Sequence, residues 1–132
     1  RELMALARFS TPHIAGYSTD GKANGTAMSV RSLTAFFGIP GFEDFFPQNV
    51  PQALNSDTIL LDERMSDSEQ IRRAVLHTYN IADDDWNLKS FTEQFEKLRG
   101  NYPIRREFTS YCVKGASPEA GKVLSALGFK VD

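Results

Sequence analysis

The longest helical pattern in the chain lies in residues 23–37. Apolar residues recur there at three- and four-residue steps, which predicts an amphipathic helix with one buried face. These residues are Ala23, Ala27, Val30, Leu33 and Phe37. Gly38 follows the pattern and would end the helix, because glycine readily adopts the left-handed conformation of a C-cap.

The residues before this helix are predicted to form a short helix and a short strand. Residues 2–7 have the pattern of the end of an amphipathic helix, and residues 9–12 favour a brief strand. Pro12 would close that strand, because proline has no N–H to donate to a neighbouring strand. The sequence starts with Arg1 and this helical tail rather than with methionine, so we expect a piece of a longer protein.

Residues 57–132 are predicted to alternate between short strands and helices in the order β-α-α-β-α-β. The strands are expected at residues 58–61, 108–113 and 129–131, where β-branched and aromatic residues concentrate. Each of the three helices has a serine at its expected N-cap, and glycine is placed to end the second and third. These signals are Ser66 with Glu69; Ser90 with Glu93 and Gly100; and Ser117 with Pro118 and Gly128. We expect an α+β fold, a small β-sheet with helices packed on one face.

Residues 39–56 are predicted to be a linker. They contain Pro40, Pro47 and Pro51 but show neither helical nor strand periodicity. A flexible spacer would be poor in aromatic residues, whereas this segment contains three phenylalanines. It is therefore expected to pack against a surface, either of another domain or of its own chain.

Composition indicates an ordinary globular domain. Of the 132 residues, 41% are hydrophobic and 24% are charged, and the formal net charge is -2. No basic field favours nucleic-acid binding, and no apolar run approaches the roughly 20 residues that cross a bilayer. No signal-peptide pattern is present. We therefore expect a soluble, cytoplasmic protein with no nucleic-acid or membrane partner.

Three further polar features predict no separate reaction centre. Cys112 is the single cysteine, lies in a predicted strand, and is expected to be a buried free thiol. The acidic run at residues 83–85 lacks the glycine turn and distal glutamate of a calcium loop, so no metal site is predicted. Arg105 and Arg106 are expected to form salt bridges or interface contacts.

The densest chemical signal is in residues 11–18, after the first predicted strand and before the long helix. Ligands of open α/β sheets bind beyond the carboxyl ends of strands, so His13 stands where a reacting group is useful. Imidazole titrates near pH 6.5 and suits the removal of a hydroxyl proton in an alcohol oxidation. Gly16 would allow a cofactor to approach the backbone, and Tyr17 offers a hydroxyl. On these grounds alone, a structural or surface role for His13 remains open.

Two blocks resemble a known family. Residues 11–26 read TPHIAGYSTDGKANGT and resemble the segment of D-2-hydroxyacid dehydrogenases that holds their catalytic histidine, most closely in the erythronate-4-phosphate dehydrogenase branch. Residues 95–111 read FEKLRGNYPIRREFTSY and are similar to the C-terminal dimerisation domain of that branch. The resemblance implies that residues 1–38 are the remnant strand and helix of a Rossmann-type, NAD-binding α/β domain, and that residues 57–132 are an α+β dimerisation domain.

The resemblance also implies an activity and its residues. The parent enzyme would oxidise 4-phospho-D-erythronate, a small phosphorylated 2-hydroxy acid, to its 2-oxo acid with NAD, toward pyridoxal phosphate. His13 matches the family's acid/base residue, Gly16 matches a cofactor contact, and Tyr17 matches a substrate contact. The family's substrate-binding arginine, its glutamate and its glycine-rich phosphate loop are expected upstream of Arg1, so this chain alone is expected to be inactive. The parent is expected to be a homodimer.

Two alternatives remain. The parent could be another D-2-hydroxyacid dehydrogenase, for example one acting on phosphoglycerate. Alternatively, residues 57–132 could be a non-catalytic regulatory domain that senses a small molecule. A helix over residues 23–37 without its parent domain is expected to expose its apolar face, to fold back, or to pair with another copy.

Overall fold

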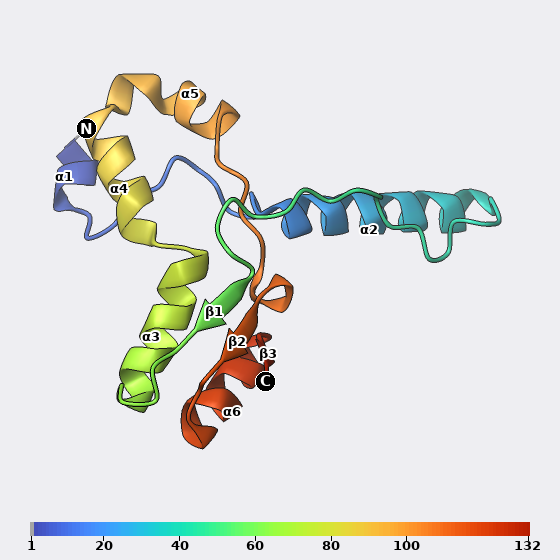
Figure 1. Ribbon diagram of the computed structural model, residues 1–132. Coiled ribbons are helices and arrows are strands. Elements are labelled where there is room, and N and C mark those ends of the chain that lie inside the picture. The colour runs from blue at the N-terminus through green and yellow to red at the C-terminus, as the bar shows by residue number, and fades with distance from the viewer. Residues whose placement is uncertain (1) are drawn as a thin grey trace.

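The computed structural model describes residues 2–132 and consists of a sheet-and-helix body with one projecting arm (Figure 1). The arm is the long helix α2, with the following segment of chain lying along it. The short helix α1 lies against α4, at the opposite side of the body from the arm. In chain order the helices are α1 (Glu2–Leu6), α2 (Thr19–Phe37), α3 (Asp67–Thr78), α4 (Ile81–Ser90), α5 (Phe95–Gly100) and α6 (Pro118–Leu127), with single 3-10 turns at Thr92–Gln94 and Phe108–Ser110.

The body is built on a three-stranded parallel sheet. Its strands β1 (Thr58–Leu60), β2 (Cys112–Lys114) and β3 (Lys130–Val131) lie in the order β1-β2-β3. Parallel neighbours need long crossover connections, and here helices α3 to α5 join β1 to β2 while α6 joins β2 to β3. Helices α3 and α6 pack against each other over the sheet. The predicted α+β class, a small sheet with helices packed on it, is confirmed.

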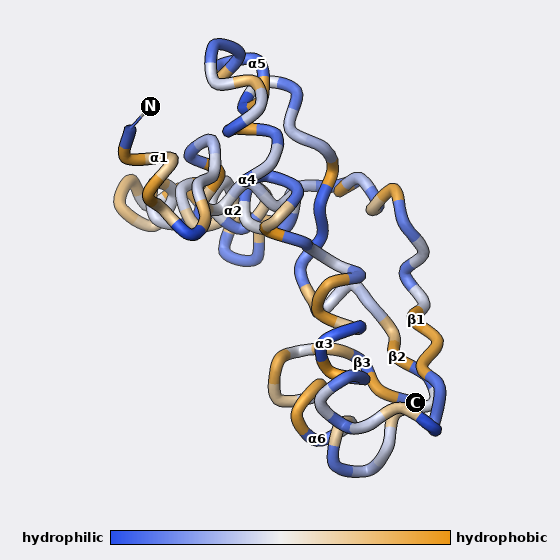
Figure 2. Tube along the Cα trace, turned by 90° about the vertical axis from the view of Figure 1, so that its left-hand side faces the viewer, coloured by the Kyte–Doolittle hydropathy of each residue, from blue (hydrophilic) through white to orange (hydrophobic). Residues whose placement is uncertain are grey.

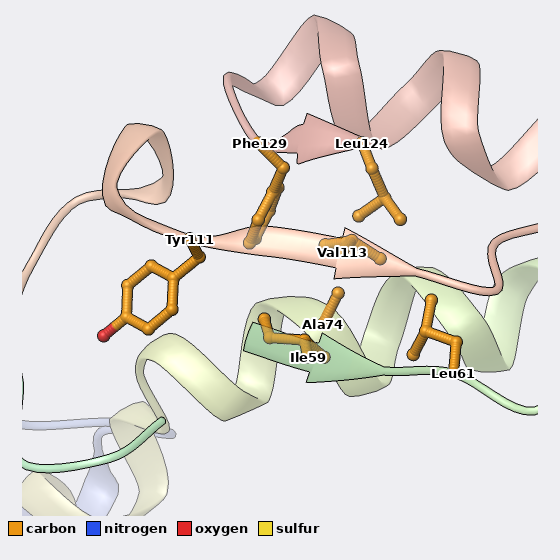
Figure 3. Close-up of a cluster of buried hydrophobic side chains, with 7 residues drawn as sticks. All are labelled: Ile59, Leu61, Ala74, Tyr111, Val113, Leu124 and Phe129. Atoms are coloured by element: carbon orange, nitrogen blue, oxygen red, sulfur yellow. The ribbon is translucent and has the colours of Figure 1, made fainter. Parts of the chain in front are cut away.

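The hydrophobic core lies between this sheet and helices α3 and α6 (Figure 3). Alternate strand residues point toward the helices, as the two-residue period of a strand requires. Phe108 lies at the edge of the core, where its ring stacks on Phe129 with the centroids 4.6 Å apart. The seven buried residues are Ile59, Leu61, Ala74, Tyr111, Val113, Leu124 and Phe129.

The serine caps predicted for α3 and α6 are confirmed. Ser66 Oγ accepts a hydrogen bond from the N–H of Glu69 at 3.4 Å, and Ser117 Oγ accepts one from Ala120 at 3.1 Å. These bonds satisfy N–H groups that have no partner inside the helix. Gly128 ends α6 with φ of 102°, in the left-handed region that glycine tolerates.

The strand predicted at residues 9–12 is wrong. These residues form no ladder, and the N–H of Ser10 donates instead to the Asp85 carboxylate at 2.7 Å. Lys89 Nζ donates to the carbonyl of Ala7 at 3.1 Å. A strand needs a neighbouring strand for its backbone groups, whereas this segment bonds to the side chains of α4.

The capping box predicted at Ser90 is also wrong. Ser90 is the last residue of α4, a helix that the sequence analysis missed. Asn80 is the actual N-cap, and its side-chain oxygen accepts from the N–H of Ala82 at 3.2 Å. The acidic run at residues 83–85 lies in the first part of this helix, where the positive end of the helix dipole stabilises negative charge. The second predicted helix shortens to the 3-10 turn and α5, and still ends at Gly100.

The strand predicted at residues 108–113 is confirmed only in its last part. Residues Phe108–Ser110 form a 3-10 turn, and the ladder begins at Cys112. Cys112 is half-buried rather than buried, and its thiol donates to Asp132 Oδ2 at 3.2 Å. The prediction for residues 129–131 is confirmed by β3.

The arm carries apolar side chains that the body does not cover. The predicted helix and its end at Gly38 are confirmed, but only Ala23 and Ala27 are buried, while Leu33 and Phe37 are exposed. Residues 39–56 form no helix or strand and run back beside α2 (Figure 1). Figure 2 shows apolar residues of β1 in orange. No helix within residues 2–132 has the length and apolar character to cross a membrane.

Candidate functional site

Residues 11–17 form two consecutive tight turns before α2. The N–H of His13 donates to the Thr11 carbonyl at 2.9 Å, and the N–H of Tyr17 donates to the Ile14 carbonyl at 3.0 Å. The second turn places Gly16 at φ of 71°, which glycine adopts without steric cost. Ile14 is buried and anchors the turns, while the imidazole of His13 is exposed.

The start of α2 holds these turns in place. Ser18 is fully buried, and its Oγ accepts from the N–H of Gly21 at 2.9 Å. A Cβ atom at Gly21 would lie 2.9 Å from the carbonyl oxygen of Gly16, closer than real Cβ contacts allow. The first turn of the helix therefore packs directly on the backbone of the predicted cofactor position.

An ion pair clamps the same end of α2 to the body. Asp20 accepts from Arg106 Nε and Nη2, both at 2.9 Å, and from the N–H of Glu107 at 2.7 Å. The N–H of Thr19 donates to the carbonyl of Arg105 at 2.8 Å. Burial raises the pKa of Asp20, but the bonds from Arg106 and Glu107 together lower it more, so its pKa lies below the usual value. The salt bridge predicted for the arginine pair is confirmed at Arg106.

Tyr17 lies among residues from α2, α5 and the chain that follows α5. Arg99 Nη2 donates to the Tyr17 hydroxyl at 3.3 Å, and the ring of Tyr102 meets that of Tyr17 edge-on with centroids 5.9 Å apart. Lys22 Nζ lies 4.5 Å from the centroid of the Tyr17 ring. The two blocks that resemble the dehydrogenase family, far apart in sequence, are therefore in contact at Tyr17.

The buried carboxylate of Asp84 holds Tyr102 in place beside Tyr17. Asp84 Oδ2 accepts hydrogen bonds from the hydroxyls of Tyr79 and Tyr102, each at 2.8 Å. Burial, then the hydrogen bond and negative charge of Asp84, raise the pKa of Tyr79 to about 12 and raise that of Tyr102 as well. Both phenols are neutral donors at neutral pH, so they hold Asp84 and fix the ring of Tyr102 beside Tyr17.

The predicted site residues His13, Gly16 and Tyr17 thus share one turn region, and the structure adds Lys22 and Arg99, which sequence reasoning missed. Both lie within the two resembling blocks, but their contacts with Tyr17 arise only when the chain folds. Within residues 2–132, no group of three or more histidine, cysteine, aspartate or glutamate side chains is arranged to hold a metal ion.

Gly16, the cofactor contact that the resemblance implies, lies on an open turn. A Cβ at Gly16 would have no atom within 4 Å, so the space outside this turn is open to an approaching group. The sheet at residues 58–131 belongs to the body and carries no glycine-rich turn of the dinucleotide-binding kind after a strand. The backbone at Gly16 is therefore accessible to an approaching group.

Comparison with known proteins places the chain in a family. Residues 52–128, more than half of the chain, match the family described as "Domain of unknown function (DUF3410)". An erythronate-4-phosphate dehydrogenase of Bacteroides thetaiotaomicron is 42% identical over 115 residues, which are 87% of this chain and 30% of the relative. Proteins of the same name from Porphyromonas gingivalis and Teredinibacter turnerae are 37% and 36% identical, over 96% and 99% of this chain and 33% and 35% of their own lengths.

The chain spans about a third of the length of these curated relatives. Their similarity extends beyond the matched domain and includes the turn region of His13, because it covers nearly the whole chain. The resemblance to erythronate-4-phosphate dehydrogenases is thereby confirmed, and the chain belongs to the DUF3410 family.

Proposed function

We propose that this chain is part of a longer NAD-dependent dehydrogenase that oxidises 4-phosphoerythronate, with His13 as its acid/base residue. The observation that carries the proposal is the similarity to proteins named erythronate-4-phosphate dehydrogenase along nearly the whole chain. The exposed imidazole, on the tight turn that precedes the Gly16 turn, supports it. The proposal places the whole protein in the cytoplasm, on the route to pyridoxal phosphate.

In this proposal His13 moves the proton of the reacting hydroxyl. The flanking turns, anchored by Ile14, fix the backbone of His13 while its ring reaches solvent. A neutral imidazole accepts the hydroxyl proton as the carbon–hydrogen bond breaks, and returns it in the reverse direction. NAD, when bound, supplies the hydride acceptor for this chemistry. Gly16 admits the cofactor edge to the backbone, and the Tyr17 hydroxyl contacts substrate oxygen.

The test is His13→Asn in the whole protein, with NADH formation as the readout. Loss of general-base catalysis predicts a fall in kcat of about 10²–10⁴-fold. His77→Asn is the matched control, because His77 is the other histidine and lies on α3, in the body. His13→Asn with unchanged kcat would falsify the assignment. Residues 1–132 alone are expected to form no NADH, because they supply only one edge of a cofactor site.

The second part of the proposal is that residues 57–132 hold two copies of the protein together. The face of the sheet opposite α3 and α6 supports it, because Leu60 is 69% exposed there in edge strand β1. Lys114 and Lys130 are exposed on the same face of the sheet as Leu60, because strand residues two apart point to the same side. Burying the uncovered side chain of Leu60 against a second copy would remove apolar surface from water.

Sedimentation velocity across a range of protein concentrations tests this interface. The unmodified chain is expected to sediment as a dimer and Leu60→Glu as a monomer, because the new charge would be buried without a partner. Leu33→Glu, on the arm, is the control and should leave the dimer intact. A chain that is monomeric throughout, or that is dissociated by the arm variant alone, would contradict an interface at β1.

A further inference from the structure

We propose that Lys22 and Arg99, which flank Tyr17, bind the phosphate group of the substrate. This inference rests on the proposed function in one respect, that Tyr17 contacts the substrate. It goes further by assigning a phosphate site to two cations, one of which comes from the domain proposed to dimerise.

The two cations converge on one aromatic ring from different helices. Lys22 lies one turn into α2, and its Nζ is 4.5 Å from the ring centroid of Tyr17. Arg99 lies near the end of α5, with Nη2 3.3 Å from the Tyr17 hydroxyl and its guanidinium carbon 6.0 Å from the same centroid. An anion placed at the Tyr17 hydroxyl would therefore meet positive charge from both helices.

The positive charge at this cluster is poorly neutralised. Arg99 Nη1 pairs with Glu96 at 3.2 Å, but the Glu96 side chain is 80% exposed and a solvated pair of this kind is weak. Lys22 forms no salt bridge within residues 2–132. The nearby Asp20 is fully engaged by Arg106 and the N–H of Glu107. The buried Asp84 carboxylate is held by the hydroxyls of Tyr79 and Tyr102 rather than by Lys22 or Arg99, which leaves both cations available to an anion.

Arg99 has hydrogen-bonding capacity that its protein partners do not use. Its Nε is buried and has no hydrogen-bond partner in the part of the chain that the structure describes. The bond from Nη2 to Tyr17, at 3.3 Å, lies beyond the usual range for N–H donors. A guanidinium carries five donors in a planar fork that matches two oxygens of a phosphate. A phosphate beside the Tyr17 hydroxyl would give this guanidinium a stronger acceptor than the phenol oxygen.

The position of the cluster suits the substrate class. His13 and Tyr17 both lie on the pair of turns at residues 11–17, so one small molecule can reach both residues. In a 4-phosphorylated 2-hydroxy acid, two bonds of the carbon chain separate the reacting carbon from the carbon that carries the phosphate. The proposed proton acceptor and the proposed phosphate site therefore lie on one short segment, as such a molecule requires. A dianionic phosphate also gains more than a single carboxylate from two cations.

Binding of inorganic phosphate to residues 1–132 tests the site without cofactor or turnover. Isothermal titration calorimetry with inorganic phosphate, at constant ionic strength and with chloride as the competing anion, should show saturable phosphate binding. Arg99→Gln is expected to raise the phosphate Kd at least tenfold, and Lys22→Gln by about threefold, since its charge is more solvated. Lys122→Gln, an exposed lysine on α6, is the matched control and should leave the Kd unchanged.

The variant Arg99→Lys and thermal melts distinguish the loss of a phosphate contact from a loss of folding. Arg99→Lys keeps the charge but loses the fork, so an intermediate Kd is expected; thermal melts check that each variant remains folded. If Arg99→Gln does not fold, Lys22→Gln decides, because Lys22 is exposed on α2. An unchanged phosphate Kd in the folded variants, or no saturable binding by the unmodified chain, would overturn the phosphate site.

The result is independent of the fate of the proposed reaction. Loss of phosphate binding in Arg99→Gln, together with an active His13→Asn enzyme, would retain the phosphate site and reject the acid/base assignment. The converse would retain His13 and reject Arg99. In the whole protein, Arg99→Gln should raise KM for the phosphorylated substrate at least tenfold, with a much smaller change in kcat.

Discussion

Replacing Asp20 by Asn removes the charge of the clamp between α2 and the body while keeping its shape. The carboxylate of Asp20 receives three hydrogen bonds, two from Arg106 and one from the N–H of Glu107. Asparagine retains one acceptor oxygen but cannot neutralise the guanidinium. The variant therefore leaves Arg106 with an uncompensated charge near the base of the arm.

The burial of the pair sets the size of the effect. Its side chains are 13% exposed for Arg106 and 16% exposed for Asp20. Breaking a buried pair typically costs about 3–5 kcal/mol, whereas an exposed pair contributes about 0.2–1 kcal/mol. Because this pair lies between those limits and asparagine keeps an acceptor, we expect about 2 kcal/mol less stability for the contact between α2 and residues 105–107.

Native-state hydrogen exchange measures this contact directly. The amides of Thr19 and Glu107 cross between the arm and the body, and their exchange should accelerate about 30-fold for a loss of about 2 kcal/mol. Glu119→Gln removes an exposed i,i+3 pair on α6 and serves as the control, with a change below about 0.5 kcal/mol. Equal exchange of Thr19 and Glu107 in the two variants would refute the clamp.

Three further perturbations follow from the body and the clamp. Gly115→Ala should lower the free energy of unfolding, measured in urea, by about 2 kcal/mol or more. The reason is that φ at Gly115 is +75° and the new Cβ would lie 2.6 Å from the Leu61 carbonyl oxygen. An unchanged midpoint of the urea transition would contradict this. Gln70→Leu should cost about 2 kcal/mol in thermal melts, because it removes the buried Gln70 amide that pairs with the half-buried N–H of Ser117. A stabilised variant would show that the amide is dispensable. The folded pKa of Asp20 lies below its ordinary value of 3.8, so its contribution to the free energy of unfolding is present above pH 3.8. That contribution is lost as the pH falls through the folded pKa. In acid titrations, the stability of Asp20→Asn should therefore decline less steeply than that of the unmodified chain.

The elements that sequence reasoning predicted correctly are those whose signals are local. Ser117 with Pro118 begins α6 and Gly128 ends it, because capping chemistry is decided within one turn. Helix α4 was missed because its acidic first turn and the apolar residues Trp86 and Leu88 show no clear amphipathic stripe. The strand expected at residues 9–12 failed because pairing depends on a neighbour that local sequence does not reveal.

In the candidate site, too, the residues placed by local sequence were predicted and those placed by distant contacts were not. His13, Gly16 and Tyr17 follow one another on consecutive turns, and a short motif was enough to place them together. Arg99 reaches Tyr17 only because α5 and its following segment fold back over the start of α2. No periodic pattern predicts such a contact, since it depends on how distant segments dock.

The parallel pairing of β1 with β2 has a consequence for the nascent chain on the ribosome. Strand β1 is made before its hydrogen-bond partner β2, which follows only after α3, α4 and α5 have been translated. At about 5–20 residues per second, the residues between Leu60 and Cys112 take on the order of 3–10 s to synthesise. During that interval Ile59 and Leu61 have no sheet to complete, so chaperone contacts at this stage of translation should concentrate on β1.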